Sequence, residues 1–368
     1  MKVALVTILD NINLGTVLQA YATADAIERV GHEVVFINYV RPSETVRYKL
    51  KEKLNRRVGL MHRMIDAVVS CTVVPWVKRR LKRDIRYRFA MTRRYNSCEQ
   101  LRIHPVDADI FMTGSDQVWN CSYNAGVDEV FFLGFTDKPK VAYAASVGTD
   151  CFPREDVKEV IGFLREYSHI TVRETATCDY IRSLGFVVKS VLDPTLLLTK
   201  AEWMSRLSIP GSRIIAEPYL LVYSVESERN DFIFKQAWSI ARQRGLRLVA
   251  MTASNAGPLK RYNADRLFAF ADVRQFLRLM RDADFVVASS FHGTAFSINF
   301  NKEFVTVTPP RFNVRMESII DKFGLRGRVV TDTIVDPASL PPLNYDAINE
   351  IMTSCRRQSF DLLSKMLI

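Results

Sequence analysis

The sequence predicts an α/β protein with two domains, and three observations support that fold class. Short apolar runs alternate with longer amphipathic stretches along most of the chain, as in proteins whose parallel strands are joined by helices. The 368 residues exceed what one ordinary hydrophobic core holds, so two domains are expected. A looser stretch at 195–215, with Pro210, Gly211 and nearby Pro218, marks the hinge between them.

The chain opens with a strand–turn–helix–strand unit. A buried strand is expected at 3–6, and the apolar positions of 17–30 fall on one face of a helix. Gly31 ends that helix, and the apolar run at 34–37 supplies the second strand. Such a unit starts a parallel sheet.

The turn between the first strand and the first helix holds small polar residues, including Asn11, Asn13 and Gly15. The turn lacks the GxGxxG pattern of a dinucleotide site. Two interpretations stay open: the turn binds a polar ligand, or an asparagine simply caps the helix.

Residues 42–103 interrupt the alternation and predict two or three basic helices, with Pro75 breaking an apolar stretch. Residues 41–100 hold 17 basic and 5 acidic side chains, a balance of +12 in a chain whose net charge is +11. No helix-turn-helix or zinc-finger pattern accompanies this charge, so no nucleic acid partner is expected. The segment is either a solvated helical hairpin or a basic surface that lies on anionic lipid headgroups.

The sheet resumes with an apolar strand at 108–112, followed by a polar turn at 113–120. That turn carries an acid, two amides and a tryptophan: Asp116, Gln117, Asn120 and Trp119. Because exposed polar clusters at strand ends seldom serve structure alone, we interpret this turn as functional.

Further alternating elements of the first domain follow up to the looser stretch at residue 195. The expected elements are a strand at 141–147, a helix at 153–167, a strand at 170–174, a helix at 175–184 and an apolar run at 187–192. Arg173 ends one of these strands, where its guanidinium suits a phosphate or a carboxylate. An ion pair with Glu174 or Asp179 is the alternative explanation.

The second domain repeats the pattern. The expected strands are 219–223, 247–251, 284–288 and 303–307, and the expected helices are 228–244, 272–281, 295–300, 311–324 and a long final helix at 347–367. The final helix is long enough to reach back over the hinge.

The stretch 288–294 joins a strand of the second domain to a helix. Free amides at the helix start favour an anion, and Gly293 lets the backbone approach a ligand. His292 adds a side chain that exchanges protons near neutral pH. The alternative is that Ser289 caps the helix and His292 is a hydrogen-bonded loop residue. The position at the carboxyl end of a strand favours a site.

Arg311 and Arg315 lie at the start of another expected helix. Positive charges there oppose the helix dipole, so one or both are expected to face a bound anion.

Features of other protein classes are missing from the sequence. It has no run of 18 apolar residues, and its start reads as a buried strand rather than a signal peptide. The six cysteines are scattered, without the spacing of a metal or disulfide framework. We therefore expect a cytoplasmic protein with reduced thiols and no metal.

Five stretches taken together resemble the polysaccharide pyruvyl transferase family over nearly the whole chain. They are Leu14-Gly15-Thr16-Val17-Leu18-Gln19-Ala20-Tyr21-Ala22, Gly114-Ser115-Asp116-Gln117-Val118-Trp119-Asn120, Val172-Arg173-Glu174, Asp193-Pro194-Thr195 and Ser290-Phe291-His292-Gly293-Thr294-Ala295-Phe296-Ser297. The second stretch is specific to that family. Each of the other stretches is weak evidence alone, but together they support the resemblance.

The resemblance implies two Rossmann-like domains that face a cleft, as in glycosyltransferases of the B type. It also implies transfer of the pyruvyl group of phosphoenolpyruvate to two hydroxyls of a sugar, which gives a cyclic ketal and phosphate without a cofactor. We expect residues 1–205, with the insertion 42–103, on the acceptor side and residues 206–345 on the donor side. Residues 346–368 form the helix across the hinge.

Within that family a histidine and arginines hold phosphoenolpyruvate, which maps onto His292 and Arg173. Many relatives carry arginine two residues before that histidine, where this chain has Ser290; the difference strengthens the case for Arg311 and Arg315 as phosphate ligands. The residues predicted to bind the donor are Arg173, Ser290, Phe291, Gly293, Thr294, Arg311 and Arg315.

We predict catalytic roles for His292 and Asp116. His292 is suited to protonate the enol carbon or to take the hydroxyl proton, and Asp116 to take that proton or orient the sugar. The residues predicted to bind the acceptor are Asn11, Asn13, Gly15, Gln117, Trp119, as a stacking surface, and Asn120.

The expected acceptor is a lipid-linked precursor of a surface polysaccharide, met by the enzyme at the inner membrane face. Two other functions stay open: a nucleotide-sugar-dependent glycosyltransferase of the same two-domain plan, and a non-catalytic glycan-binding protein.

Overall fold

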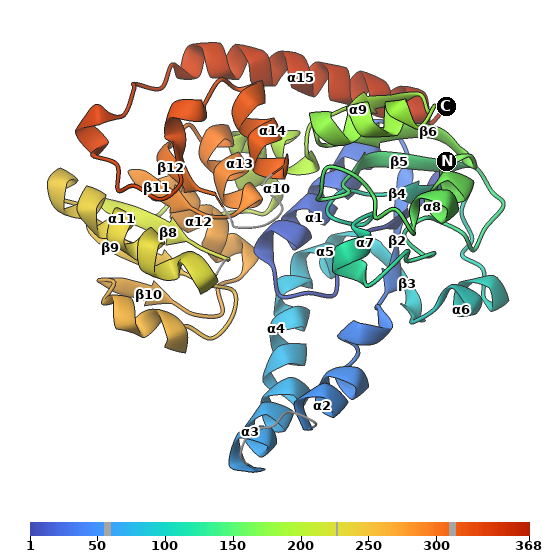
Figure 1. Cartoon of the computed structure of the whole chain (residues 1–368), viewed down its shortest axis with the longest axis horizontal. Helices are drawn as coiled ribbons and strands as arrows, with labels where there is room; N and C mark the ends of the chain where they lie inside the picture. Colours follow the sequence, from blue (N-terminus) through green and yellow to red (C-terminus); the bar gives the residue numbers. More distant parts are fainter. Residues whose placement is uncertain (55–59, 226, 309–313) are drawn as a thin grey trace.

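The computed structural model describes residues 1–54, 60–225, 227–308 and 314–368 (Figure 1). It contains two parallel sheets, each flanked by helices, in the first and second parts of the chain. None of the described helices is both long enough and apolar enough to span a membrane.

The first sheet has seven parallel strands in the order β3-β2-β1-β4-β5-β6-β7. The strands are β1 Lys2–Val6, β2 Glu33–Tyr39, β3 Ala90–Tyr95, β4 Ile110–Thr113, β5 Lys140–Ala145, β6 Tyr167–Val172 and β7 Val188–Ser190. The order reverses between β1 and β4, and open α/β sheets bind ligands at such a switch point. The polar turns that follow β1 and β4 therefore lie side by side at the carboxyl edge.

The helices of this domain are α1 Leu14–Arg29, α6 Cys98–Ile103, α7 Cys121–Asn124, α8 Val157–Leu164, α9 Thr175–Ser183 and α10 Lys200–Arg206. Helix α1 begins earlier than predicted because Asn13 caps it, accepting hydrogen bonds from the amides of Gly15 and Thr16. The polar turn is therefore shorter than expected, and Gly15 lies in the first helical turn.

The second sheet has six parallel strands in the order β10-β9-β8-β11-β12-β13. They are β8 Tyr219–Tyr223, β9 Arg247–Met251, β10 Arg266–Phe268, β11 Phe285–Ala288, β12 Glu303–Val307 and β13 Val329–Val330. The helices are α11 Asn230–Arg244, α12 Val273–Asp282, α13 Phe291–Asn299 and α14 Val314–Lys322. Here the switch point lies between β8 and β11, so the start of α13 borders it.

The basic insertion consists of α2 Val46–Leu54, α3 Leu60–Cys71, α4 Val73–Leu81 and α5 Arg83–Arg88. Helices α2 and α3 project from the body, and α4 runs back toward it (Figure 1). Helices α4 and α5 also contact the second domain, because Arg80 pairs with Asp272 and Arg274 pairs with Asp84.

The prediction that the insertion is helical throughout is wrong at residues 90–95. These residues form β3, an edge strand that pairs in parallel with β2. Of its six residues only Tyr95 is buried, so the strand lacks the apolar run by which the inner strands are predicted.

The long helix α15 Tyr345–Met366 runs across both domains (Figure 1). The hydroxyl of Ser359 accepts a hydrogen bond from the amide of Leu192, and Arg356 donates to the carbonyl of Leu196 and to Asn299 of α13. The helix therefore fixes the segment that joins the two sheets.

A continuous hydrophobic core also joins the two domains. Trp203 of α10, which is fully buried, packs against Tyr21 of α1 and against Phe296 of α13. The relative position of α1 and α13 is thus set by core packing as well as by polar contacts.

The prediction that Trp119 forms a stacking surface for the acceptor is wrong. The side chain is 0% exposed, stacks on Phe132 with ring centroids 5.4 Å apart, and donates from Nε1 to the carbonyl of Phe131. The turn after β4 folds its large apolar ring into the core of the first domain.

Replacing Trp119 with alanine is therefore expected to act on stability. Removal of a fully buried tryptophan should lower the free energy of unfolding by about 3–5 kcal/mol, measured by urea denaturation. Tyr87→Ala, at a side chain that is 93% exposed, serves as the control and should change it by less than about 0.5 kcal/mol. A loss in Trp119→Ala no larger than in this control would contradict the assignment.

Candidate active site

A cavity of about 240 Å³ lies where the carboxyl ends of the two sheets meet. Its walls come from the turns after β1, β4 and β11 and from the start of α14. The polar and charged lining residues are Asn11, Asn13, Thr16, Asp116, Gln117, Tyr123, Ser289, Ser290, His292 and Arg315. Stretches of the chain that are more than a hundred residues apart thus form one site.

Asp116 occupies a strained position in the turn after β4. Its φ of 73° lies in the left-handed region, which is rare for a residue with a side chain and often marks functional sites. Oδ1 accepts a hydrogen bond from the amide of Gln117 at 2.9 Å, and Oδ2 accepts one from the hydroxyl of Thr16 at 2.7 Å. The carboxylate is therefore held toward α1.

Asp116 is 5% exposed, and burial alone would raise the pKa of its carboxyl group. The imidazole of His292 when it is protonated, the guanidinium groups of Arg173 and Arg315, and the hydrogen bond from Thr16 outweigh that effect and lower the pKa below its usual value. Asp116 is thus ionised at neutral pH and can accept a hydrogen bond or a proton.

His292 lies in the first turn of α13, which begins at Phe291 rather than at the predicted residue 295. Ser290, not Ser289, caps this helix by accepting a hydrogen bond from the amide of Gly293 at 2.9 Å. The imidazole packs directly on Gly15 of the other domain: a Cβ atom at residue 15 would lie 2.1 Å from Nδ1. Only glycine permits this approach.

The imidazole of His292 is 5% exposed, and burial lowers its pKa, although the carboxylates of Asp193 and Asp116 oppose the shift. Nε2 lies 3.9 Å from Oδ2 of Asp193 and has no hydrogen-bond partner in the described part of the chain. A neutral ring with an unused nitrogen is suited to accept a proton.

Arg173 is buried beneath this site. Its guanidinium pairs with Glu174 at 2.9 Å and with Asp193 at 2.8 Å, and it lies 4.2 Å from the ring centroid of Phe291. The alternative of a pair with Asp179 is wrong, because Asp179 pairs with Arg182. Arg173 does not line the 240 Å³ cavity, and of its nitrogens Nη2 is left without a partner in the described chain.

Asp193 is a functional candidate that the sequence analysis did not single out by its chemistry. Oδ1 accepts hydrogen bonds from the amide and hydroxyl of Thr195, and Oδ2 accepts them from Arg173 and from Ser115. Burial opposes its ionisation, but Arg173 and His292 lower its pKa. The ionised carboxylate faces Nε2 of His292, where it would stabilise an imidazolium.

The remaining predicted residues differ in whether they line the cavity. Asn11, Asn13, Gln117, Ser290, Phe291 and Arg315 line the cavity, whereas Arg311 lies outside the described residues. Gly293, Thr294 and Asn120 do not line it.

Those three residues have structural contacts instead. Thr294 donates to Thr306, and Asn120 caps α7 and donates to Gln117. A Cβ atom at residue 293 would crowd Ala288, so Gly293 serves helix packing rather than approach to a ligand.

A second cavity of about 300 Å³ adjoins the first on the side of the second domain. Both are lined by Asn13 and Val225. The polar lining of the second cavity is uncharged and consists of Asn13, Tyr223, Ser224, Ser227, Asn230, Thr252, Ser254 and Asn255. Hydroxyls and amides without net charge suit a neutral polyhydroxyl ligand.

Across the ranges that the structure describes, no three His, Cys, Asp or Glu side chains are grouped so as to hold a metal ion.

Solved structures share the fold at low sequence identity. The UDP-GlcNAc 2-epimerase from Neisseria meningitidis bound to UDP-GlcNAc aligns with a TM-score of 0.53 at 11% identity, covering 100% of this chain and 99% of that one. The UDP-GlcNAc 2-epimerase from Methanocaldococcus jannaschii gives 0.52 at 10%, covering 96% and 92%. Arabidopsis thaliana UGT89C1 complexed with UDP gives 0.50 at 10%, covering 100% and 99%.

These neighbours confirm the predicted fold class, two Rossmann-like domains arranged as in B-type glycosyltransferases. No curated protein matches the chain.

The family resemblance extends over most of the chain. A match to the description "polysaccharide pyruvyl transferase" covers residues 13–310. That range includes all five stretches on which the resemblance rests, and residues from each of them meet in or beneath the cavity. The chain therefore belongs to the polysaccharide pyruvyl transferase family.

Proposed function

We propose that this protein transfers the pyruvyl group of phosphoenolpyruvate to two hydroxyls of a sugar in a surface-polysaccharide precursor, forming a cyclic ketal and releasing phosphate. The observation that carries the proposal is the pairing of a neutral, buried His292 with an ionised Asp116 in one cavity between the domains. Membership of the pyruvyl transferase family supports it.

The cavity has features suited to the phosphate and carboxylate of phosphoenolpyruvate. The first turns of α1 and α13 both border it, and the first-turn amides that Asn13 and Ser290 do not cap lack partners within the helix. Arg315 adds a positive charge at the start of α14. Ser290 is used as a helix cap, so we assign the donor contact to these amides and to Arg315, while the buried guanidinium of Arg173 adds positive charge from beneath the cavity.

The reaction needs one proton added and two removed. The methylene carbon of phosphoenolpyruvate gains a proton, which makes the neighbouring carbon electrophilic. A sugar hydroxyl bonds to that carbon and loses its proton, phosphate leaves, and a second hydroxyl closes the ketal. Two hydroxyl protons are released. One of them accounts for the proton that turns the methylene carbon into a methyl group, and the other leaves with phosphate.

His292 is the residue suited to move these protons. The neutral imidazole takes the proton of the bound hydroxyl, and the imidazolium, stabilised by Asp193, 3.9 Å from Nε2, delivers that proton to the methylene carbon as the hydroxyl oxygen bonds to the neighbouring carbon. Asp116 stays ionised, so its role is to orient the hydroxyl and to stabilise positive charge that develops in the transition state.

We assign the acceptor sugar to the uncharged cavity of about 300 Å³ next to the reacting groups. This cavity belongs mainly to the second domain, which changes the expectation of an acceptor site confined to residues 1–205. Asn11, Asn13 and Gln117 contribute from the first domain.

The proposal includes a lipid-linked acceptor and a cytoplasmic enzyme at the inner membrane face. Besides the balance of +12 in residues 41–100, helix α3 exposes Met61, Met64, Ile65 and Val68. The spacing of these apolar residues places them on one face of the helix. Basic charge beside an exposed apolar face is typical of segments that lie on anionic membranes.

A nucleotide-sugar-dependent glycosyltransferase is the second candidate, because the neighbours bound to UDP-GlcNAc and UDP share the two-domain arrangement. One experiment separates the two. Phosphate release from phosphoenolpyruvate is measured with a panel of lipid-linked and synthetic glycan acceptors, and the melting temperature is measured with UDP-sugars. Release that depends on an acceptor supports pyruvyl transfer; a thermal shift with UDP-sugars and no release overturns it.

Replacement of His292 with glutamine is expected to lower kcat by roughly 10²–10⁴, because proton transfer is lost. Wild-type kcat/KM should fall on the acidic side only below the ordinary histidine pKa of about 6.5, since burial lowers the pKa and protonation removes the base. His169→Gln, at an exposed histidine on β6, is the control and should keep full activity. An unchanged rate in His292→Gln removes this residue from the mechanism.

Gly15→Ala is expected to lower kcat by about 10² or more, because the new methyl group displaces the imidazole of His292. Circular dichroism should show intact secondary structure. Gly162→Ala in α8, where a Cβ meets no atom within 4 Å, is the matched control and should leave activity unchanged. Full activity in Gly15→Ala would mean that the position of His292 is not critical.

Docking on the membrane is tested by co-sedimentation with vesicles. We expect binding to anionic vesicles that weakens at high salt, because each basic residue near such a surface contributes about 1 kcal/mol. Neutral vesicles serve as the control. Absence from both vesicle types would leave the insertion as a solvated hairpin.

A further inference from the structure

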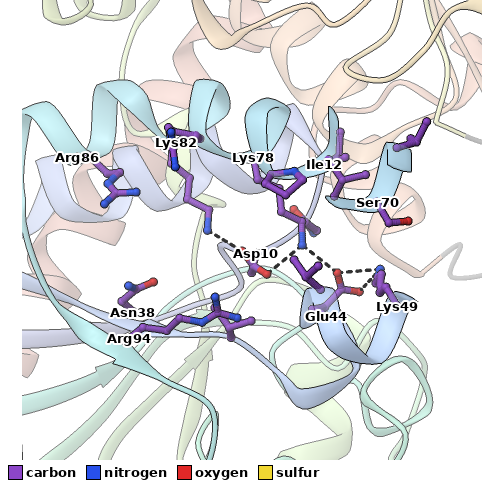
Figure 2. A pocket seen from close by; sticks show the side chains of 17 residues that line it. Asp10, Ile12, Asn38, Glu44, Lys49, Ser70, Lys78, Lys82, Arg86 and Arg94 are labelled. Carbon is purple, nitrogen blue, oxygen red and sulfur yellow. Dashed lines mark hydrogen bonds and ion pairs between the residues drawn. The ribbon is translucent and has the colours of Figure 1, made fainter. Parts of the chain in front are cut away.

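A third and larger cavity, of about 590 Å³, lies between the basic insertion and the carboxyl edge of the first sheet (Figure 2). Helix α4 forms one wall, the segment after β2 forms another, and the turn after β1 closes it on the side of the active site. The proton chemistry proposed above uses none of its charged side chains.

The charges in this cavity are unbalanced. Its lining includes six basic side chains, Lys49, Lys78, Arg79, Lys82, Arg86 and Arg94, against two acidic ones, Asp10 and Glu44. Asp10 pairs with Lys78 at 2.9 Å and with Lys82 at 2.8 Å, and Glu44 pairs with Lys49 and Lys78. The two carboxylates therefore form ion pairs with three lysines, and the six basic side chains still outnumber the two acidic ones.

The arginines of the cavity carry that excess. Within the described part of the chain, Arg79, Arg86 and Arg94 form no ion pair; Arg94 donates only to the amide oxygen of Asn96. Figure 2 shows Lys82, Arg86 and Arg94 directed into the same end of the cavity, around Asn38 and Asp10. Several cations that converge without enough carboxylates form a site for an anion such as phosphate.

Most of the uncharged lining is apolar, which a small anion does not need; the polar exceptions are Asn11, Asn38 and Ser70. Val46, Val69, Val74 and Pro75 from the insertion face Ile12 and Val40 from the first domain. Val69 lies in α3, the helix whose exposed apolar face includes Met64 and Val68. The apolar wall thus continues out of the cavity along α3, as an aliphatic chain would require.

The cavity is also connected to the active site. Asn11 lines both this cavity and the 240 Å³ cavity, and Ile12 lines both this cavity and the uncharged one. One ligand can therefore extend from the basic cavity, across the turn after β1, to the reacting groups.

We propose that this cavity binds the phosphate or diphosphate ester of a long aliphatic alcohol, with the phosphate near Lys82, Arg86 and Arg94 and the hydrocarbon along the valines and α3. If the proposed function holds, this ester is the lipid carrier of the acceptor sugar. The cavity would then hold the carrier while the sugar reaches His292.

The test measures binding to the full-length protein by titration calorimetry, without phosphoenolpyruvate or sugar. The probes are farnesyl diphosphate, farnesol as the uncharged lipid, and inorganic diphosphate as the lipid-free anion. Farnesyl diphosphate should bind at least roughly tenfold more tightly than either control, because only it engages both walls. Equal affinity for inorganic diphosphate would indicate a site for free phosphate compounds, and equal affinity for farnesol a plain apolar pocket; each overturns the proposal.

Variants locate the site. Arg86→Ala combined with Arg94→Ala should weaken farnesyl diphosphate binding roughly tenfold or more, and Val69→Asn should weaken it without changing the affinity for inorganic diphosphate. Arg357→Ala, at an exposed arginine on α15, is the matched control. Unchanged binding in the double variant would overturn the assignment to this cavity.

Turnover separates this inference from the proposed function. If the carrier binds here, the double variant should raise KM for a lipid-diphosphate-linked acceptor and leave KM for phosphoenolpyruvate unchanged. A lack of any pyruvyl transfer, with farnesyl diphosphate still bound, would overturn the function but keep the site. Transfer with equal KM values in both proteins would overturn the site but keep the function.

Discussion

The buried ion pairs of Arg173 are the interaction on which the rest of the site depends. A guanidinium removed from water is stable only if its charge is matched, and Glu174 and Asp193 match it on two sides. Each carboxylate accepts a further bond, Glu174 from Ser146 and Asp193 from Ser115. The network ties the ends of four neighbouring strands, β4 to β7, and fixes the carboxylate that faces His292. Loss of the arginine would leave two buried charges unpaired.

The second requirement is that the domains meet closely. The imidazole of His292 belongs to one domain and rests on Gly15 of the other, while Thr16 holds Asp116 from the same helix turn. His292 and Asp116 are therefore brought together only when the domains are in contact. Trp203 and helix α15 maintain that contact at a distance from the chemistry. The short turn after β1 borders all three cavities, so its conformation shapes each of them.

Local patterns in the sequence were sufficient for most of the fold. The strands at 219–223, 247–251 and 303–307 have the predicted bounds, because strands buried on both faces of a parallel sheet are continuous apolar runs. Gly245 ends α11 in a left-handed conformation, as glycine after a helix indicates. The edge strand β3 was missed, since an exposed strand carries no such run. The predicted sites followed from the rule that ligands bind at the carboxyl ends of parallel strands.

What the sequence by itself determined is thus the α/β class, the basic insertion and the candidate pair of His292 and Asp116. The tertiary structure alone decided that Trp119 is core, that Asp193 faces the imidazole and that the insertion encloses a charged cavity. The physical reason is the separation along the chain of the residues that are in contact. Periodicity reports how a residue relates to its neighbours along the chain, whereas these contacts join residues from 12 positions apart, for Trp119 and Phe131, to 99 positions apart, for Asp193 and His292. Their pairing depends on how two sheets and a shared core place the strand ends in space.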